Sequence, residues 1–175
     1  MHQLMNKPDE KYVYHGSEDR LEAINPTRHL RARKDKEGNI ITIFDDISFH
    51  ATPYKWIALA YTYDPKPYVI DGRTIHYSMG VSLYNPINEL ITILGFESLE
   101  KSLEALYGDG GWLAIFEKDK FFHIEGLGDL EVVTKEVIAP VKVERIADPV
   151  RELATLGISF RFVDLGKPEN EARGY

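Results

Sequence analysis

The sequence predicts an α+β fold, in which short strands and three helices are interspersed along one chain. Most segments carry β-branched and aromatic residues in short runs or with a period of two, as in residues 12–14 and 141–146, which favours strands. Only residues 52–63, 98–107 and 150–156 have the spacing or the end signals of helices. Because strands and helices do not alternate regularly, a doubly wound parallel sheet is not predicted.

Size and composition limit what the chain is expected to be. It has 175 residues, no cysteine and a formal net charge of −7. We expect one domain, residues 1–175, whose polar ends at 1–10 and 167–175 fray. The lack of cysteine excludes disulfides and thiolate zinc sites and fits a reducing, cytoplasmic compartment. No apolar run approaches the roughly 20 residues of a membrane helix, so no membrane partner is expected. The negative charge does not suggest general affinity for nucleic acid.

Each predicted helix has a recognisable boundary. Thr52 and Pro53 are typical of an N-cap and a first helical residue, and Asp148 before Pro149 has the same role later in the chain. Gly108 ends the second helix. The clearest apolar stripe belongs to the first helix and consists of Trp56, Leu59, Ala60 and Tyr63.

The strands are predicted from short apolar runs and from turn signals between them. Asp71 followed by Gly72 predicts the turn of a hairpin within residues 68–84. Residues 88–94 are apolar and ambiguous between helix and strand. Further strands are predicted at residues 39–44, 47–51, 112–116, 121–124, 131–134 and 159–163.

Residues 27–36 form a basic run that contains Arg28, Arg31 and Arg33. Charged runs usually lie in water, so a solvated loop is the favoured interpretation. The alternative is a mobile basic loop that binds phosphates, for which the paired N–H donors of arginine are well suited.

His15 and Gly16 end the first predicted strand and are candidate binding residues. A histidine at the end of a buried strand has a fixed direction, and its ring can donate or accept a hydrogen bond there. Glycine has no side chain to keep a ligand from its backbone N–H and C=O, so a planar carboxamide can pair with both. The competing interpretation is a strand that ends in a turn, with His15 a structural residue.

Three separated segments carry a family resemblance: Tyr14-His15-Gly16-Ser17, Phe49-His50-Ala51-Thr52 and Asp129-Leu130-Glu131-Val132-Val133. The first resembles the first-strand motif of ADP-ribosyltransferases of the diphtheria toxin and poly(ADP-ribose) polymerase type. The second, followed by a helix with Ala58 and Tyr61, is similar to their second motif. The third is similar to their third motif, a glutamate that opens a strand. The segments stand in the family's order, and the resemblance spans roughly residues 12–145.

The resemblance implies two small twisted antiparallel sheets that form a split β-sandwich with an NAD cleft and peripheral helices. It implies that NAD is the substrate and that His15 hydrogen-bonds the ribose next to nicotinamide. Gly16 would hold the carboxamide through its backbone, with Ser17 beside it. Tyr61 would stack on the nicotinamide ring, and Glu131 would bind the ribose and the cation that develops on it. A fixed carboxylate there stabilises the transition state more than the ground state.

The chain departs from the family at two positions and offers rivals at a third. Phe49 stands where many relatives carry a tyrosine, or His50 does if the alignment shifts by one residue. A phenyl ring at this position supports the ligand by stacking only. Asp129 stands where arginine-modifying relatives carry a longer glutamate or glutamine. Glu125 and Glu136 are rivals for the catalytic carboxylate.

Together these features predict a mono-ADP-ribosyltransferase that splits NAD and passes ADP-ribose to a macromolecular acceptor, either protein or nucleic acid. One alternative is an NAD glycohydrolase, in which water is the acceptor. Another is an NAD-dependent RNA 2′-phosphotransferase, for which Arg28 or Arg31 would bind phosphate. The last is a non-catalytic module that binds a nucleotide. No histidine spacing indicates a metal site, so none is predicted.

Overall fold

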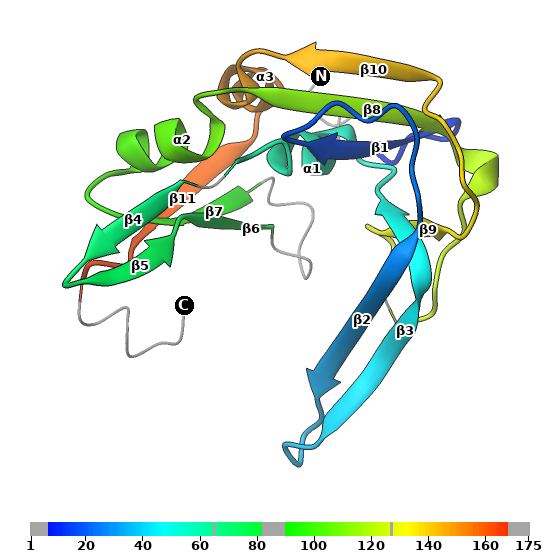
Figure 1. Cartoon of the computed structure of the whole chain (residues 1–175), viewed down its shortest axis with the longest axis horizontal. Coiled ribbons are helices and arrows are strands. Elements are labelled where there is room, and N and C mark those ends of the chain that lie inside the picture. Colours follow the sequence, from blue (N-terminus) through cyan, green and yellow to red (C-terminus); the bar gives the residue numbers. More distant parts are fainter. Residues whose placement is uncertain (1–6, 65, 82–89, 127, 168–175) are drawn as a thin grey trace.

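The computed structural model describes residues 7–64, 66–81, 90–126 and 128–167, and they form a mixed α+β fold (Figure 1). Three α helices accompany small, mostly antiparallel sheets in this part of the chain, which confirms the predicted fold class. Among the helices described there, none combines the length and apolar character that crossing a membrane requires.

The first sheet is formed by β1 (Tyr12–Ser17), β8 (Gly111–Glu117) and β10 (Lys142–Ile146). The strand β8 lies in the centre and pairs antiparallel with both neighbours. The sheet is buried on both faces, because Val13 and Phe116 pack in one hydrophobic cluster and Leu113 packs in the other. This sheet therefore holds His15 and Gly16 on a rigid edge strand next to the core.

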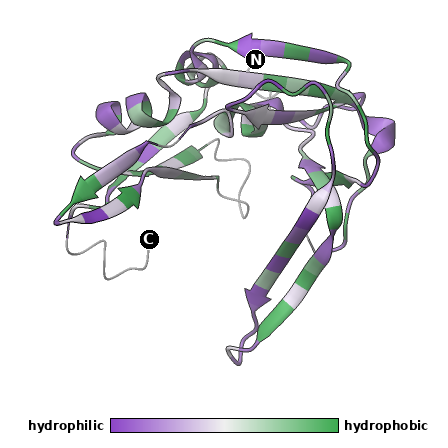
Figure 2. Cartoon of the chain, viewed as in Figure 1, coloured by the Kyte–Doolittle hydropathy of each residue, from purple (hydrophilic) through white to green (hydrophobic). Residues whose placement is uncertain are grey.

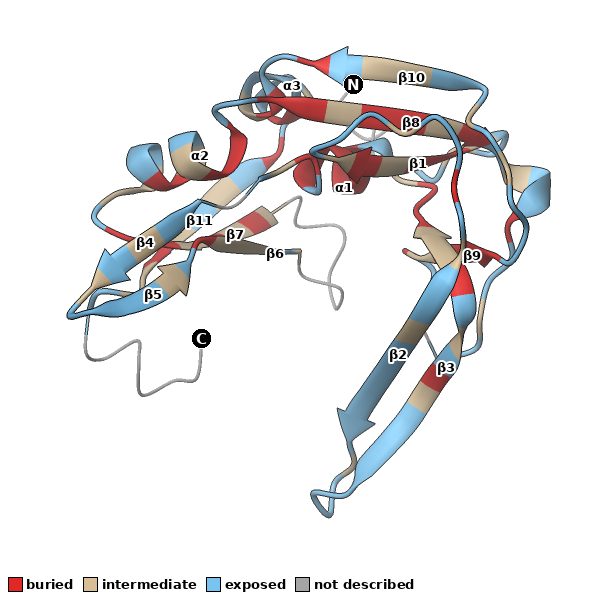
Figure 3. Ribbon diagram, in the orientation of Figure 1, coloured by how far each residue is buried: buried red, intermediate tan, exposed pale blue. Residues whose placement is uncertain are grey.

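The second sheet is formed by β2 (Thr27–Lys34), β3 (Ile40–Ala51) and β9 (Val132–Thr134), all antiparallel. Strands β2 and β3 extend away from the first sheet as a long arm (Figure 1). The arm is exposed along most of its length (Figure 3), and hydrophilic residues cover most of β2 (Figure 2).

Two sequence expectations are wrong in this arm. The basic run at residues 27–36 is not a loop but includes β2. Its side chains have no apolar pattern, but its backbone N–H and C=O groups find their hydrogen-bond partners on β3. The strands predicted at 39–44 and 47–51 form one strand, β3, which begins at Ile40. Asp45 and Asp46 do not end it, because both lie on β3 and are paired to β2. Asp35 closes the arm by accepting hydrogen bonds from the backbone N–H groups of Glu37 and Asn39, at 2.9 and 2.8 Å.

The third sheet contains β6 (Ser78–Val81), β7 (Leu90–Gly95) and β11 (Ser159–Asp164), and β4 (Pro67–Ile70) pairs with β5 (Arg73–His76) in a hairpin. The predicted turn is confirmed, with positive φ of 50° at Asp71 and 72° at Gly72. Residues 90–95 form a strand, which decides the ambiguous segment, whereas 82–89 lie outside the described residues. Strands β7 and β11 are parallel, so the implied set of purely antiparallel sheets is wrong at this point.

The helices are α1 (Lys55–Ala60), α2 (Leu99–Tyr107) and α3 (Pro149–Thr155). The last two begin as predicted, because the side chains of Ser98 and Asp148 accept hydrogen bonds from the backbone N–H groups of Lys101 and Arg151. The first begins later than predicted. Thr52 instead pairs with β1, and its side chain accepts a hydrogen bond from the N–H of Tyr54.

Helix α1 packs directly against β1, and this contact requires a glycine. A Cβ atom on Gly16 would lie 1.8 Å from the carbonyl oxygen of Ala58. Five consecutive residues of α1 are buried, so the short helix lies within the core (Figure 3). Gly16 thus has a packing role that is independent of any ligand.

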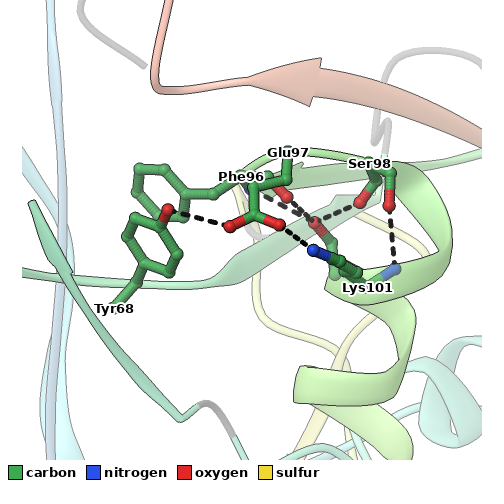
Figure 4. Close-up of polar contacts among 6 residues, drawn as sticks. Tyr68, Phe96, Glu97, Ser98 and Lys101 are labelled. Carbon is green, nitrogen blue, oxygen red and sulfur yellow. Dashed lines mark hydrogen bonds and ion pairs between the residues drawn. The ribbon is translucent and has the colours of Figure 1, made fainter.

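The corner between β7 and α2 is fixed by a polar and aromatic cluster (Figure 4). Glu97 adopts a positive φ of 64° and bonds to the hydroxyl of Tyr68 and the amine of Lys101. The rings of Tyr68 and Phe96 stack at 4.2 Å between centroids. These contacts stabilise a backbone conformation that is uncommon for a residue with a side chain.

Three further expectations need correction or lie outside the described residues. Residues 118–120 form the 3₁₀ helix η3 (Lys118–Lys120), and 121–124 do not form a strand but only an isolated bridge from Phe122 to Val133. The N-terminal fraying expected for residues 1–10 does not apply to Asp9, whose carboxylate accepts hydrogen bonds from the N–H of Tyr12 and the hydroxyl of Tyr14. Residues 1–6 and 168–175 lie outside the described part.

Candidate active site

The ring of His15 is held within β1 by one hydrogen bond and one ring contact. The predicted strand end at His15 and Gly16 is wrong, because pairing with β8 continues to Ser17. Its Nδ1 lies 2.9 Å from the backbone carbonyl oxygen of His50. A carbonyl only accepts, so Nδ1 carries the proton and Nε2 of the neutral ring is left as an acceptor. The ring also lies against Phe49, at 4.5 Å between centroids.

Burial is the largest influence on the His15 ring. It lowers the pKa of His15, and the nearby His50 lowers it further, while the hydrogen bond to the carbonyl of His50 opposes the change. The net pKa is below the ordinary value of 6.5, so the ring is neutral at pH 7. Its Nε2 is therefore able to accept a hydrogen bond from a hydroxyl group.

Glu131 and His50 are brought together by the pairing of β3 with β9. His50 lies opposite Val133, and Glu131 comes two residues before Val133, so both side chains lie on the same face of the sheet. Ser48, two residues before His50, lies on that face as well. The Nδ1 of His50 contacts Oε1 of Glu131, and its Nε2 lies 2.9 Å from Oγ of Ser48.

The carboxylate of Glu131 is partly buried, with its side chain 27% exposed, and it is surrounded by donors. Burial acts to raise the pKa of Glu131, but the hydrogen bond from His50 and the electrostatic interactions with His50 and Arg31 outweigh it. The net pKa lies below the ordinary value of 4.5. Glu131 is therefore a fixed negative charge at neutral pH.

Strand β2 supplies a cation and a second histidine to the same face. Arg31 lies 3.5 Å from Glu131, and the rings of His29 and His50 are 4.3 Å apart between centroids. Burial lowers the pKa of His29, and electrostatic interactions with His50 and Arg31 lower it further, while Glu131 opposes the change. The predicted residue Arg31 thus joins the site, and His29 is a neighbour that the sequence did not indicate.

Arg28 is not brought to this cluster. It precedes His29 on β2, so its side chain points to the opposite face of the arm. There its Nε and one terminal nitrogen both bond to the carboxylate of Asp45 at 2.7 Å. The two predicted phosphate-binding arginines therefore lie on different faces.

Tyr61 lies at the C-terminal end of α1, and 49% of its surface is exposed. Burial of the hydroxyl raises the pKa of Tyr61, with smaller contributions from Tyr63 and Glu131, whereas Arg31 opposes the change. The hydroxyl therefore lies close enough to Glu131 and Arg31 for both charges to influence its pKa. An exposed ring at this position is available for stacking, unlike a core residue.

The backbone of Gly16 is directed away from β8. The neighbouring residue on the same side, Tyr14, pairs there with Thr52 through two hydrogen bonds of 2.8 and 2.9 Å. Alternate residues of a strand direct their backbone groups to the same side, so the N–H and C=O of Gly16 also point away from β8. Within the described ranges, Gly16 has no backbone partner on that side. Ser17 accepts a local hydrogen bond from the N–H of Asp19 at 3.1 Å.

The rival carboxylates lie elsewhere. Glu125 and Asp129 are exposed, and Glu136 is exposed and lies 3.9 Å from Lys120. Neither rival, Glu125 or Glu136, forms a hydrogen bond or ion pair with His15 or His50 in the part of the chain that the structure describes, and the same holds for Asp129. Geometry therefore favours Glu131 as the candidate catalytic carboxylate.

His50 is the main residue whose role the sequence left undecided. Phe49 faces β1, where its ring contacts His15 and Phe116, and His50 faces Glu131. The signal in the sequence was the spacing of Ser48 and His50, which places both on one face of a strand. Its interpretation required the register between β3 and β9.

Comparisons with known proteins add no assignment, since no family model, no curated protein and no solved structure matches the chain. The candidate site therefore rests on its own geometry: a neutral histidine, an ionised glutamate, an arginine and an exposed tyrosine from four different elements.

Proposed function

We propose that the chain is an NAD-dependent mono-ADP-ribosyltransferase. The observation that supports this best is the convergence of His15, from β1, and Glu131, from the residue before β9, on the two sides of His50. These residues are far apart in the sequence, and they belong to the first and third of the segments that resemble the family. A shared site of these two side chains is what the proposal requires.

The reaction breaks the bond between the nicotinamide nitrogen and C1′ of its ribose. The bonding electrons go to nicotinamide, which leaves as a neutral amide, and positive charge develops on the sugar. A nucleophile of the acceptor then donates a lone pair to C1′ and loses its proton. The negative charge of Glu131 would stabilise the cationic sugar. This stabilisation is strongest in the transition state, where the positive charge on the sugar is greatest.

The remaining residues have roles that fit their positions. Nε2 of the neutral His15 would accept a hydrogen bond from a ribose hydroxyl. The free N–H and C=O of Gly16 would pair with the carboxamide of nicotinamide, and Tyr61 would stack on its ring. Phe49 supports His15 through the contact between their two rings.

A direct test is to incubate the protein with NAD labelled on the adenosine and with cell extract. Release of nicotinamide together with label on protein or nucleic acid supports the transferase. Nicotinamide release without labelled macromolecules identifies an NAD glycohydrolase instead. If NAD is not consumed but raises the melting temperature, the chain is a nucleotide-binding module. The variant Glu131→Gln is the matched control, because it keeps the shape of the side chain without its charge.

One observation favours a second candidate function, an NAD-dependent RNA 2′-phosphotransferase. Arg31 lies 3.5 Å from Glu131, so a cation that pairs with phosphate stands beside the proposed catalytic carboxylate. A phosphate oxygen would then be the nucleophile that attacks C1′ and displaces nicotinamide. The neighbouring hydroxyl of the same ribose would next attack the phosphorus and lose its proton, and the RNA 2′-oxygen would leave and take up a proton. Loss of the 2′-phosphate from a synthetic RNA, only when NAD is present, would distinguish this reaction from transfer to protein.

A further inference from the structure

A row of three side chains runs along one face of the second sheet and ends at Glu131. Ser48 is fully buried, and the side chain of His50 is only 11% exposed. Oγ of Ser48 meets Nε2 of His50, and Nδ1 of His50 meets Oε1 of Glu131. Both ring nitrogens of His50 are therefore engaged, one at each end of the row.

The direction of the hydrogen bonds follows from the chemistry of the partners. An ionised carboxylate only accepts, so Nδ1 of His50 carries the proton that bonds to Glu131. The hydroxyl of Ser48 donates to Nε2 when the ring is neutral, and it accepts from Nε2 when the ring is protonated. Ser48 can thus hold the ring in either protonation state, and the orientation of the ring does not depend on pH.

Ring contacts restrict His50 further. The ring of His29 lies 4.3 Å away, and that of Phe44 lies 5.6 Å away and edge-on. The backbone of His50 is held as well, because its carbonyl accepts the hydrogen bond from His15. A side chain fixed on this many sides can orient the flexible carboxylate that it contacts.

We propose that His50 is a positioning residue, which orients the carboxylate of Glu131, favours its ionised form and is itself held by Ser48. This inference rests on the proposed function. His50 acts through Glu131 and need not touch NAD. Its hydrogen bond fixes one oxygen of the Glu131 carboxylate, so that the second oxygen points toward the sugar. The carboxylate is then already oriented before the reaction, and no rotational entropy is lost in reaching the transition state.

The titratable groups around His50 come from two strands, β1 and β2, and from the residue that precedes β9. Arg31 and His29 face it from β2, and His15 faces it from β1. Glu131 is the one anion in contact with it among the described residues. The other three neighbours are basic. Removal of the His50 imidazole therefore deletes one hydrogen-bond donor to Glu131, while the guanidinium of Arg31 remains beside the carboxylate.

The test compares four variants by nicotinamide release across a pH series. In His50→Phe the ring shape stays but both polar atoms are lost, and we expect kcat to fall roughly 10- to 100-fold while KM for NAD changes less than about threefold. The acid limb of the kcat profile should move to higher pH, because Glu131 loses a donor that favours its ionised form. His50→Asn places an amide donor near the position of Nδ1 and should recover most of the loss. Ser48→Ala should have a smaller effect of the same kind.

The control is His76→Phe, which makes the same change at an exposed histidine of β5 and should leave both parameters unchanged. Circular dichroism and the melting temperature verify that each variant is folded. A folded His50→Phe protein with unchanged kcat, or with lower kcat but an unmoved acid limb and no recovery in His50→Asn, overturns the inference alone. A wild-type protein that releases no nicotinamide overturns the proposed function, and the inference falls with it.

Discussion

His15 and Glu131 never touch, yet both are bound to the same residue. The imidazole of His15 donates to the backbone carbonyl of His50, and the carboxylate of Glu131 contacts the side chain of His50. A backbone contact on one side and a side-chain contact on the other hold the two groups at the end of β3. Their relative position is thus set by the pairing of β3 with β9 and by the bridge between Tyr14 of β1 and Thr52, which follows β3.

The first prediction concerns the charge of Glu131. In Glu131→Gln the amide oxygen can still accept from His50, so the fold is retained, but the negative charge is lost. We expect kcat for nicotinamide release to fall by about 100-fold or more, as for the loss of an electrostatic contact made in the transition state. Glu136→Gln, an exposed glutamate of the same segment, is the control. Full activity in Glu131→Gln would exclude this carboxylate from the reaction.

The second prediction concerns NAD binding by His15. His15→Ala removes the acceptor Nε2 and should weaken NAD binding about tenfold, which corresponds to one hydrogen bond of about 1.4 kcal/mol. Isothermal titration calorimetry with the wild type and with His76→Ala gives the comparison. Equal affinity of His15→Ala and wild type would contradict the ribose contact.

The third prediction concerns the close contact of β1 with α1. Gly16→Ala places a Cβ 1.8 Å from the carbonyl oxygen of Ala58, so strand and helix must separate. We expect the free energy of unfolding in urea to fall by about 1–3 kcal/mol or more. Gly80→Ala in β6 is matched to it, because nothing lies within 4 Å of a Cβ built there. Equal losses in the two variants would mean that the contact with α1 is unimportant for stability.

The fourth prediction concerns pH. The pKa of Glu131 in the folded chain lies below 4.5, since the contacts with His50 and Arg31 outweigh burial, which acts in the opposite direction. The ionised carboxylate therefore stabilises the folded chain fully above pH 4.5, and this contribution is lost as the pH falls through the lower folded pKa. The difference in free energy of unfolding between wild type and Glu131→Gln should shrink on acidification below that value. A difference that grows instead would show that the charge is destabilising.

Local signals predicted much of the fold. The turn at Asp71 and the cap at Asp148 depend on a few adjacent residues, and these predictions were confirmed. The basic strand β2 was missed because its side chains are exposed on both faces, so it has no apolar period to detect. Only its pairing with β3, which depends on residues far along the chain, makes it a strand.

The candidate site could be predicted only in part. The identities of His15, Tyr61 and Glu131 came from short motifs, and the structure brings them into one region. The role of His50 depends on which residue of β3 lies opposite Val133, and a shift of one residue would have turned its side chain to the other face. Register between distant strands is not encoded in any local pattern, so this contact needed the structure.

The turn at Asp35 and a β-bulge beside Arg31 together determine which side chain of β2 meets Glu131. The chain reverses direction between Lys34 and Ile40 with a fixed number of residues, and the bulge then shifts the register by one residue, so that Arg31 stands opposite Phe44. One residue added to or removed from that reversal would slide β2 and bring Leu30 or Ala32 to the place of the guanidinium. The length of this remote loop therefore governs the charge beside the carboxylate, although no residue of the loop contacts it.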